Sequence, residues 1–215
     1  MGHNNAKVVK AITDQSKKLS HVSNFYAHAP GMELAEQLIQ MNYESQTVAQ
    51  LYELLFYSDL RVRQKAQFEL VTRKEEGTKA FINAINQKEN QLARIHGIWG
   101  VGIQAGKHAE IGKLLYDLLK DSDNEIKAQA AKVLGDLYDK GAEDQLIDNL
   151  SSSEPRVVFF AAQALGRIQS EKALPSLLKV IEQNADKDLY IRHAAVLALS
   201  RIGKTEPIVA LKSST

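Results

Sequence analysis

The chain has 215 residues, 44% of them hydrophobic and 25% charged, which is the composition of one or two folded domains rather than of a disordered chain. Its 27 Lys and Arg residues nearly balance its 26 Asp and Glu residues, so the formal net charge of +1 gives no general attraction to nucleic acid or anionic membranes. The absence of Cys excludes disulfides, Cys-ligated zinc, iron–sulfur clusters and covalent c-type haem within this sequence. No apolar run approaches the roughly 20 residues of a membrane span, and the start, MGHNNAKVVK, contains no hydrophobic signal region.

Residues 1–44 are the least regular part of the sequence and are predicted to form an N-terminal capping segment. Within this segment, Ala6–Leu19 is expected to be a polar helix, Ser20–Gly31 a loop and Met32–Met41 a short helix. A repeating pattern begins at Ser45, so residues 45–215 are predicted to form a separate repeat domain.

The clearest unit of the pattern is the stretch Glu154–Ile168. Val157, Ala161 and Leu165 recur at four-residue intervals and predict one apolar face of a helix. Pro155 falls in the first turn, where its missing N–H removes no helical hydrogen bond. The stretch therefore predicts a helix that starts near Pro155 and buries one face.

Four other stretches repeat this helix. Their first apolar residues are separated by 31 to 34 residues, at Val62, Ala93, Ile126, Val157 and Ile191. Each is followed four residues later by a small residue and eight residues later by an aliphatic one. Each is preceded by a polar residue that can cap the helix: Asp59, Asn90, Asp123, Ser153 or Glu154, and Asp188.

A shorter helix is expected before each of these. The five stretches are Thr47–Phe56, Thr78–Ile85, Ala109–Leu119, Glu143–Leu150 and Ala173–Ile181. A period of this length, made of two short helices, predicts an all-α chain folded as an α–α superhelix of about five helix pairs. A sixth first helix starts at Glu206 without a partner, so the last repeat is expected to be truncated and the chain to be a fragment of a longer protein.

The segments EIKAQAAKVLGDL, PRVVFFAAQALGRI and YIRHAAVLALSRIGK resemble HEAT repeats, which form armadillo-like α-solenoids. An Asp before the second helix and a basic residue just after its first apolar position recur in that family. Here the basic residues are Arg63, Arg94, Lys127 and Arg192, and Val158 departs from the pattern. The resemblance implies that these charged groups bridge adjacent repeats and belong to the scaffold.

A narrower resemblance comes from SDLRVRQKAQFELVTR and ARIHGIWGVGIQAGK. These segments are similar to the helical-repeat part of secreted bacterial proteins that join a sugar-dehydrogenase-like β-propeller, a HEAT segment and a c-type cytochrome domain. The chain contains neither the propeller nor the Cys-x-x-Cys-His haem motif. The resemblance therefore implies a dehydrogenase-associated spacer whose parent works in the periplasm or at the cell surface, with any redox chemistry outside this chain.

One predicted helix contains Gly97, Gly100 and Gly102 around Trp99. Each glycine should cost roughly 1 kcal/mol relative to alanine in a helix interior, so some interaction must offset the loss. Close helix–helix packing is one explanation. The other is a groove where Trp99 and His96 contact a partner.

The sequence gives no basis for assigning catalytic, cofactor-binding or metal-binding residues. None of the six histidines has the His-x-x-x-His spacing that places two rings on one helical face. There is no Gly-x-Ser-x-Gly motif and no glycine-rich phosphate loop. We therefore expect any enzymatic activity to lie in domains outside this chain.

The first hypothesis is a non-enzymatic scaffold that binds a protein partner or holds neighbouring domains of its parent chain at a fixed distance. Its second helices are expected to line the concave surface of the superhelix. The candidate contact residues on that surface are Arg61, Gln91, His96, Trp99 and Tyr190.

The alternative is a nucleic-acid-binding HEAT-like protein, similar to DNA glycosylases that grip the phosphate backbone with a concave basic face. The side chains that could form this face are Arg61, Arg63, Lys65, Arg94, Lys127, Arg156 and Arg192. Acidic residues are interleaved with them, namely Glu69, Glu125, Asp136 and Asp188. This interleaving and the near-zero net charge favour the scaffold.

Overall fold

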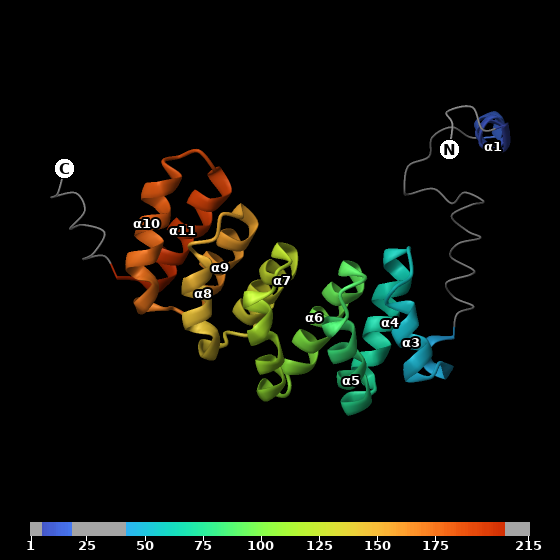
Figure 1. The fold of residues 1–215 in the computed structure, drawn as a ribbon, viewed down its shortest axis with the longest axis horizontal. Coiled ribbons are helices and arrows are strands. Elements are labelled where there is room, and N and C mark those ends of the chain that lie inside the picture. The colour runs from blue at the N-terminus through green and yellow to red at the C-terminus, as the bar shows by residue number, and fades with distance from the viewer. Residues whose placement is uncertain (1–5, 19–41, 205–215) are drawn as a thin grey trace. The chain divides into compact units, whose positions relative to one another are not determined.

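A computed structural model describes residues 6–18 and 42–204 of the chain. The chain divides into two units, Met1–Asn42 and Tyr43–Thr215, and each is considered by itself. The described part of the first unit is one helix, α1 (Ala6–Lys18), which agrees with the helix predicted there (Figure 1).

Three predictions fall on residues that the structure does not describe. They are the loop at Ser20–Gly31, the short helix at Met32–Met41 and the truncated repeat that begins at Glu206.

The second unit consists of stacked helix pairs, and its described residues contain no strand. The first helices of the pairs are α3 (Val48–Leu54), α5 (Lys74–Asn86), η2 (Ala109–Lys120), α8 (Glu143–Asn149) and α10 (Leu174–Asn184). The second helices are α4 (Leu60–Thr72), α6 (Gln91–Ala105), α7 (Asn124–Asp136), α9 (Pro155–Arg167) and α11 (Leu189–Ile202). Three short 3₁₀ turns complete the unit: η1 (Tyr43–Ser45), η3 (Lys140–Ala142) and η4 (Glu171–Ala173). The all-α solenoid of five helix pairs is confirmed.

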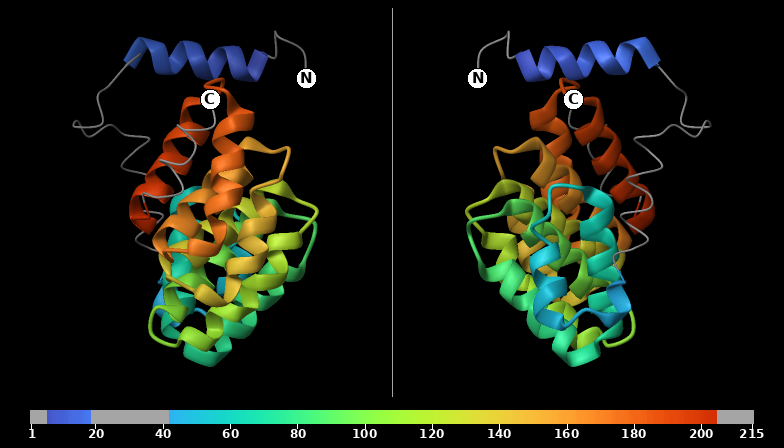
Figure 2. Two further views of the ribbon diagram at one scale, coloured as in Figure 1. Left: turned by 90° about the vertical axis from the view of Figure 1, so that its left-hand side faces the viewer. Right: turned by 90° about the vertical axis from the view of Figure 1, so that its right-hand side faces the viewer.

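The helices of this unit form two layers. The second helices pack against one another in chain order, α4 on α6, α6 on α7, α7 on α9 and α9 on α11. On the other side, α3 packs on α5 and η2 on α8. Figure 1 shows the pairs in sequence from α3 to α11, and Figure 2 views them from either end.

Two first helices differ from their prediction. The third is a 3₁₀ helix, η2, rather than an α-helix, over nearly the predicted residues. α5 begins at Lys74 instead of Thr78, because Arg73 is both the last cap of α4 and the first cap of α5. The two helices therefore follow each other without a loop, a connection that composition does not signal.

The predicted caps explain where the second helices begin. The Asp59 carboxylate accepts a hydrogen bond from the Arg61 backbone N–H at 2.8 Å, and Asn90 Oδ1 accepts one from Ala93 at 2.9 Å. Asp123 and Asp188 cap α7 and α11 in the same way. α9 is the exception, since Glu154 makes no side-chain cap and the helix starts instead with a proline.

The aligned apolar positions form the core. Ala66, Ala130, Ala161 and Ala195 are fully buried, and so are Leu70, Leu134 and Leu165. Ile191 in the last repeat is only half-buried. The core is therefore continuous from repeat to repeat, as expected for units that cannot bury their own apolar face alone.

Successive second helices touch at one repeated pair of positions. A glycine stands nine residues after the aligned apolar position in three of the second helices. A Cβ built on this glycine would lie only 2.5 to 2.7 Å from a residue of the next second helix, the one seven residues after that helix's own aligned position. The three pairs are Gly102 with Val133, Gly135 with Ala164, and Gly166 with Ala198. Glycine is required here because the neighbouring helix occupies the place of the side chain.

The turn that leaves each second helix also repeats. Twelve residues after the aligned apolar position, the backbone is left-handed in four of the five repeats, at Lys74, Tyr138, Gln169 and Gly203. Only the last of these is a glycine. In the second repeat the equivalent residue, Ala105, is the last residue of α6.

Candidate functional site

The clearest unexplained surface lies on the solvent-exposed faces of α4 and α6. Second helices bury one face, so their other face should be polar, yet large apolar side chains are exposed there. We call this group the α4–α6 surface; it consists of Leu60, Phe68, Leu92, Trp99 and Ile103. α7 and α9 expose no large hydrophobic side chain, whereas α11 exposes Leu189, Tyr190 and Val196. Exposed apolar groups therefore occur on particular second helices and are not a property of every repeat.

Helical spacing aligns these residues into two stripes. On α4, Leu60 and Phe68 are eight residues apart and are 48% and 55% exposed. On α6, Leu92 and Ile103 are 47% and 42% exposed, with half-buried Trp99 between them. Residues at these intervals share a helix face, and the two helices pack side by side.

Trp99 is held in place by two contacts. Its indole N–H donates a hydrogen bond of 2.9 Å to the Gln129 side-chain oxygen on α7. Its ring meets His96 edge to face, with 5.1 Å between the ring centres. A rigid aromatic group with its polar atom satisfied by the protein offers a preformed apolar contact.

His96 itself is buried, at 1% exposure. Its Nε2 accepts a hydrogen bond from Arg63 Nε at 3.1 Å, which leaves Nδ1 to donate to Gln67 Oε1 at 2.7 Å. Burial, and then the nearby charge of Arg63, lower the pKa of His96 to about 4. A neutral, enclosed imidazole with both nitrogens occupied cannot contact a partner, so the prediction that His96 belongs to an exposed surface is corrected.

Two of the basic residues that recur near the start of the second helices make structural contacts within the repeats. Arg63 donates to the carbonyl oxygens of Tyr57 and Ser58 at 2.7 and 2.8 Å. Arg94 donates to the Ile85 carbonyl at 2.8 Å and pairs with the Asp121 carboxylate. Both arginines are buried and cannot reach a phosphate.

The partner of Arg94 is Asp121, which follows η2 and lies 27 residues away in the sequence. Burial alone would raise the pKa of Asp121, but hydrogen bonds from Arg94, from the Asp123 backbone N–H and from Lys88 hold it well below its usual value. Asp121 therefore stays ionised and ties η2 to α6.

A cavity of about 670 Å³ lies at the end of the two stripes. Val71 and Thr72 from the last turn of α4 and Ile103 from α6 line it, together with Thr78 and Ile111. Val71 and Ile103 lie one turn beyond Phe68 and Trp99, so the cavity continues the α4–α6 surface. We call it the Ile103 pocket.

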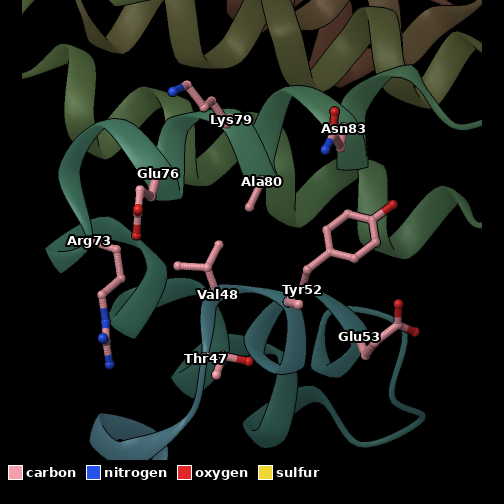
Figure 3. Close-up of a pocket in the computed structure, with 10 residues that line it drawn as sticks. Thr47, Val48, Tyr52, Glu53, Arg73, Glu76, Lys79, Ala80 and Asn83 are labelled. Atoms are coloured by element: carbon pink, nitrogen blue, oxygen red, sulfur yellow. The ribbon is translucent and has the colours of Figure 1, made fainter.

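A second hollow, an open groove of about 740 Å³, separates α3 from α5. Figure 3 shows Val48 and Tyr52 of α3 directed toward Ala80 of α5. Arg73 and Lys79 on its edge are paired with Glu69 and Glu75. Glu53 and Glu76 also line the groove, so it has a small apolar floor and an acidic rim, and its apolar area is smaller than that of the α4–α6 surface.

The predicted contact residues do not form one continuous surface in the structure. Arg61 is exposed but paired with Asp59, and Gln91 is exposed and donates to Asp123 at 2.8 Å. Trp99 lies at the centre of the α4–α6 surface. Tyr190 is 77% exposed on α11, and α7 and α9 stand between it and α6 (Figure 1).

Four residues of the surface were missed from the sequence: Leu60, Phe68, Leu92 and Ile103. A signal did exist, because these apolar residues fall outside the core positions that the repeat alignment defines. Apolar residues out of phase with a known core stripe indicate an exposed patch.

Two properties of the described residues bear on function. No three of their His, Asp and Glu side chains are grouped closely enough to hold a metal ion. None of their helices is both long and apolar enough to cross a membrane.

Comparison with known proteins supports the architecture. A family model described as HEAT repeats matches residues 78–158, 112–200 and 143–215. The chain is similar in structure to the complex of CpcE and CpcF of phycocyanin lyase from Nostoc sp. PCC7120, with a TM-score of 0.60, 21% identity, and coverage of 88% of this chain and 72% of that one. It is also similar to a designed armadillo repeat protein in complex with the peptide (KR)4, with a TM-score of 0.52, 18% identity, and coverage of 78% and 86%. At these identities the likeness concerns the fold alone.

Curated relatives match only a short segment. Isoleucine 2-epimerase of Lentilactobacillus buchneri is 50% identical over 42 residues, which are 19% of this chain and 9% of that protein. Acetylornithine aminotransferase of Clostridium acetobutylicum is 55% identical over 38 residues, 18% of this chain and 10% of that protein. The chain thus spans about a tenth of the length of these relatives.

Proposed function

Since the chain belongs to the HEAT-repeat family, we propose that it is a non-enzymatic scaffold that binds a protein partner through the α4–α6 surface. The observation that carries this proposal is the concentration of exposed large apolar side chains on two adjacent second helices. Apolar patches that the fold does not need to expose are typical of protein interaction sites.

The anatomy of the surface fits such a role. Trp99 is the kind of rigid aromatic anchor that dominates binding energy at interfaces. The designed armadillo repeat protein holds the peptide (KR)4, so a stack of this general kind can present a surface to a peptide.

The nucleic-acid alternative is not favoured by the contacts of its proposed residues. Arg63 and Arg94 are buried. Arg61, Arg156 and Arg192 are paired with Asp59, Glu125 and Asp186. A backbone reader needs several free cations on one face, and most of this set is already neutralised.

The finer hypothesis, a periplasmic or cell-surface arm of a dehydrogenase-like haem protein, rests on the sequence resemblance alone. None of the relatives described above is a dehydrogenase or a cytochrome. Sequencing the parent gene would test it, because a propeller on one side and a Cys-x-x-Cys-His motif on the other are required by the hypothesis.

Binding through the α4–α6 surface can be tested by replacing Phe68 with a photo-crosslinking amino acid and identifying adducts formed in cells by mass spectrometry. We expect one dominant protein adduct, and we expect Ile103→Ser to reduce it severalfold. The matched control is Val196→Ser, which removes an aliphatic side chain of similar exposure, 52% against 42% for Ile103, from α11. An adduct pattern that is the same in both variants would contradict the proposal.

A further inference from the structure

The Ile103 pocket has apolar walls and a closed polar floor. Val71, Ile103 and Ile111 supply the apolar surface. At the floor, Thr78 Oγ1 donates to Gln104 Oε1 at 2.8 Å, and Gln104 Nε2 donates to the Lys74 carbonyl at 3.1 Å. These polar atoms are satisfied by one another, so what remains for a guest is an apolar hollow suited to an aliphatic or aromatic side chain.

The rim of the pocket carries unpaired positive charge. Glu75 is paired with Lys79 at 3.2 Å, and Glu110 lies 3.9 Å from His108. Lys74 and Lys107 also line the pocket, and neither makes an ion pair with any residue in the described part of the chain. Lys79 therefore neutralises Glu75, whereas His108 is charged only if protonated and does not by itself offset Glu110. The two ammonium groups of Lys74 and Lys107 outnumber this one carboxylate, so the rim is positive on balance.

The length of the apolar surface indicates the size of the guest. Leu92 and Ile103 are eleven residues apart on α6, which corresponds to about 16 Å at 1.5 Å per residue. A small molecule in the pocket would leave the stripe of Leu92 and Trp99 uncovered. A polypeptide segment can fill the pocket and cover the stripe together.

We propose that the α4–α6 surface binds an acidic amphipathic segment of another protein. This inference rests on the proposed function and specifies the partner. One apolar side chain of the segment enters the Ile103 pocket, further apolar side chains cover Trp99 and Leu92, and flanking carboxylates pair with Lys74 and Lys107. The apolar contacts supply affinity, and the two ion pairs select an acidic over a basic partner.

Two synthetic helical peptides of about 12 residues test the proposal, since that length covers the stripe. Both carry leucine along one face; one has Glu at its other positions and the second has Lys. Binding is measured by fluorescence anisotropy of the labelled peptide and by the emission of Trp99, the single tryptophan of the chain. We expect the acidic peptide to bind about tenfold more tightly than the basic one, to shift the Trp99 emission, and to lose its binding in Ile103→Gln.

The charge assignment is tested with the double variant Lys74→Glu/Lys107→Glu, which should lose the preference for the acidic peptide. Its matched control is Lys140→Glu/Lys179→Glu, which makes the same change in net charge on exposed side chains elsewhere in the second unit. All four positions are on the surface, and unchanged thermal unfolding of both variants verifies that they fold.

Three results would overturn the inference. If the basic peptide binds more tightly and Ile103→Gln abolishes that binding, the acidic partner is wrong while the protein-binding role of the surface stands. If duplex DNA displaces the acidic peptide with a steep salt dependence, the two lysines serve phosphates instead. If neither peptide binds, the inference fails, and the cross-linking experiment with Phe68 decides the proposed function separately.

Discussion

Buried polar side chains join the first two repeats. Arg63 lies 33 residues before His96, about one repeat, and the two form a hydrogen bond of 3.1 Å between α4 and α6. Gln67 and the backbone carbonyls around Tyr57 complete the set, so each buried donor has an acceptor. A satisfied buried network of this kind fixes the relative position of the two helices.

This network makes stability depend on pH. The pKa of His96 is lowered from 6.5 to about 4 in the folded chain, chiefly by burial. As the pH falls below about 6.5, the unfolded chain binds a proton that the folded chain does not, so the free energy of unfolding decreases. We expect a loss of about 2 kcal/mol between pH 7.5 and pH 5, measured by urea denaturation.

The variant His96→Gln should lose that pH dependence, although it is less stable at neutral pH. His193→Gln serves as the control, because His193 is exposed on α11. Equal pH dependence in the wild type and His96→Gln would show that another group is responsible.

The pair of Arg94 and Asp121 gives a second prediction at this scale. Their side chains are 4% and 5% exposed and lie 2.5 Å apart. Arg94→Ala leaves a buried carboxylate without its main partner and should lower the free energy of unfolding by about 3 kcal/mol. Lys88 also pairs with Asp121 but is 65% exposed, so Lys88→Ala should cost less than about 1 kcal/mol. Denaturant midpoints that rank the two variants the other way would refute this assignment.

At the scale of the helix, the spacing of the second helices is set by small residues. Gly135 faces Ala164 and Gly166 faces Ala198, so α7, α9 and α11 meet through equivalent positions. The contact is with backbone atoms, which cannot move aside as a flexible side chain can. The repeat of this pair places the same kind of close contact at the α7–α9 and α9–α11 interfaces.

Adding a single methyl group at Gly135 should therefore lower the free energy of unfolding. Its Cβ would lie 2.7 Å from the Ala164 Cα, so Gly135→Ala forces α7 and α9 apart. We expect a loss of about 1–3 kcal/mol despite the better helix propensity of alanine. Gly106→Ala is the matched control, because the nearest atom there is 3.4 Å away and the backbone is already helical. A stability gain in Gly135→Ala would contradict the observed packing.

Across the whole stack, each repeat is stabilised by its neighbours. α7 packs against both α6 and α9, and α9 packs against both α7 and α11. Among the described helices, α4 has a second-helix neighbour on one side, namely α6. Stability in such arrays is close to a sum of repeat and interface contributions, so the inner helices gain two interfaces.

Amide hydrogen exchange should show this gradient. We expect the slowest exchange in α7 and α9 and exchange at least about tenfold faster in α3 and α4. Uniform protection from α3 to α11 would indicate that the stack unfolds as one cooperative unit.

The sequence by itself determined the repeat, the two-helix unit and the core. Val62, Ala66 and Leu70 recur in register because every repeat must bury the same face, and cap residues such as Asp59 mark helix starts through local hydrogen bonds. These signals depend on neighbours within a few residues, so they can be read from one chain. The left-handed turns at Lys74, Tyr138 and Gln169 carry no such signal, because none is a glycine and the stacking of repeats imposes their conformation.

Only the tertiary structure decided which residues form the candidate site. His96 and Trp99 are neighbours in one helix, yet one is enclosed between α4 and α6 and the other lies at the surface. In the sequence Arg94 looks like a free basic residue, but in the structure it pairs with Asp121, which follows η2 and lies 27 residues away. The Ile103 pocket is likewise formed by residues of three repeats, with Val71 from α4, Ile103 from α6 and Ile111 from η2. Such contacts depend on how the repeats stack, because the partners lie about one repeat apart and no local pattern specifies which side chains meet.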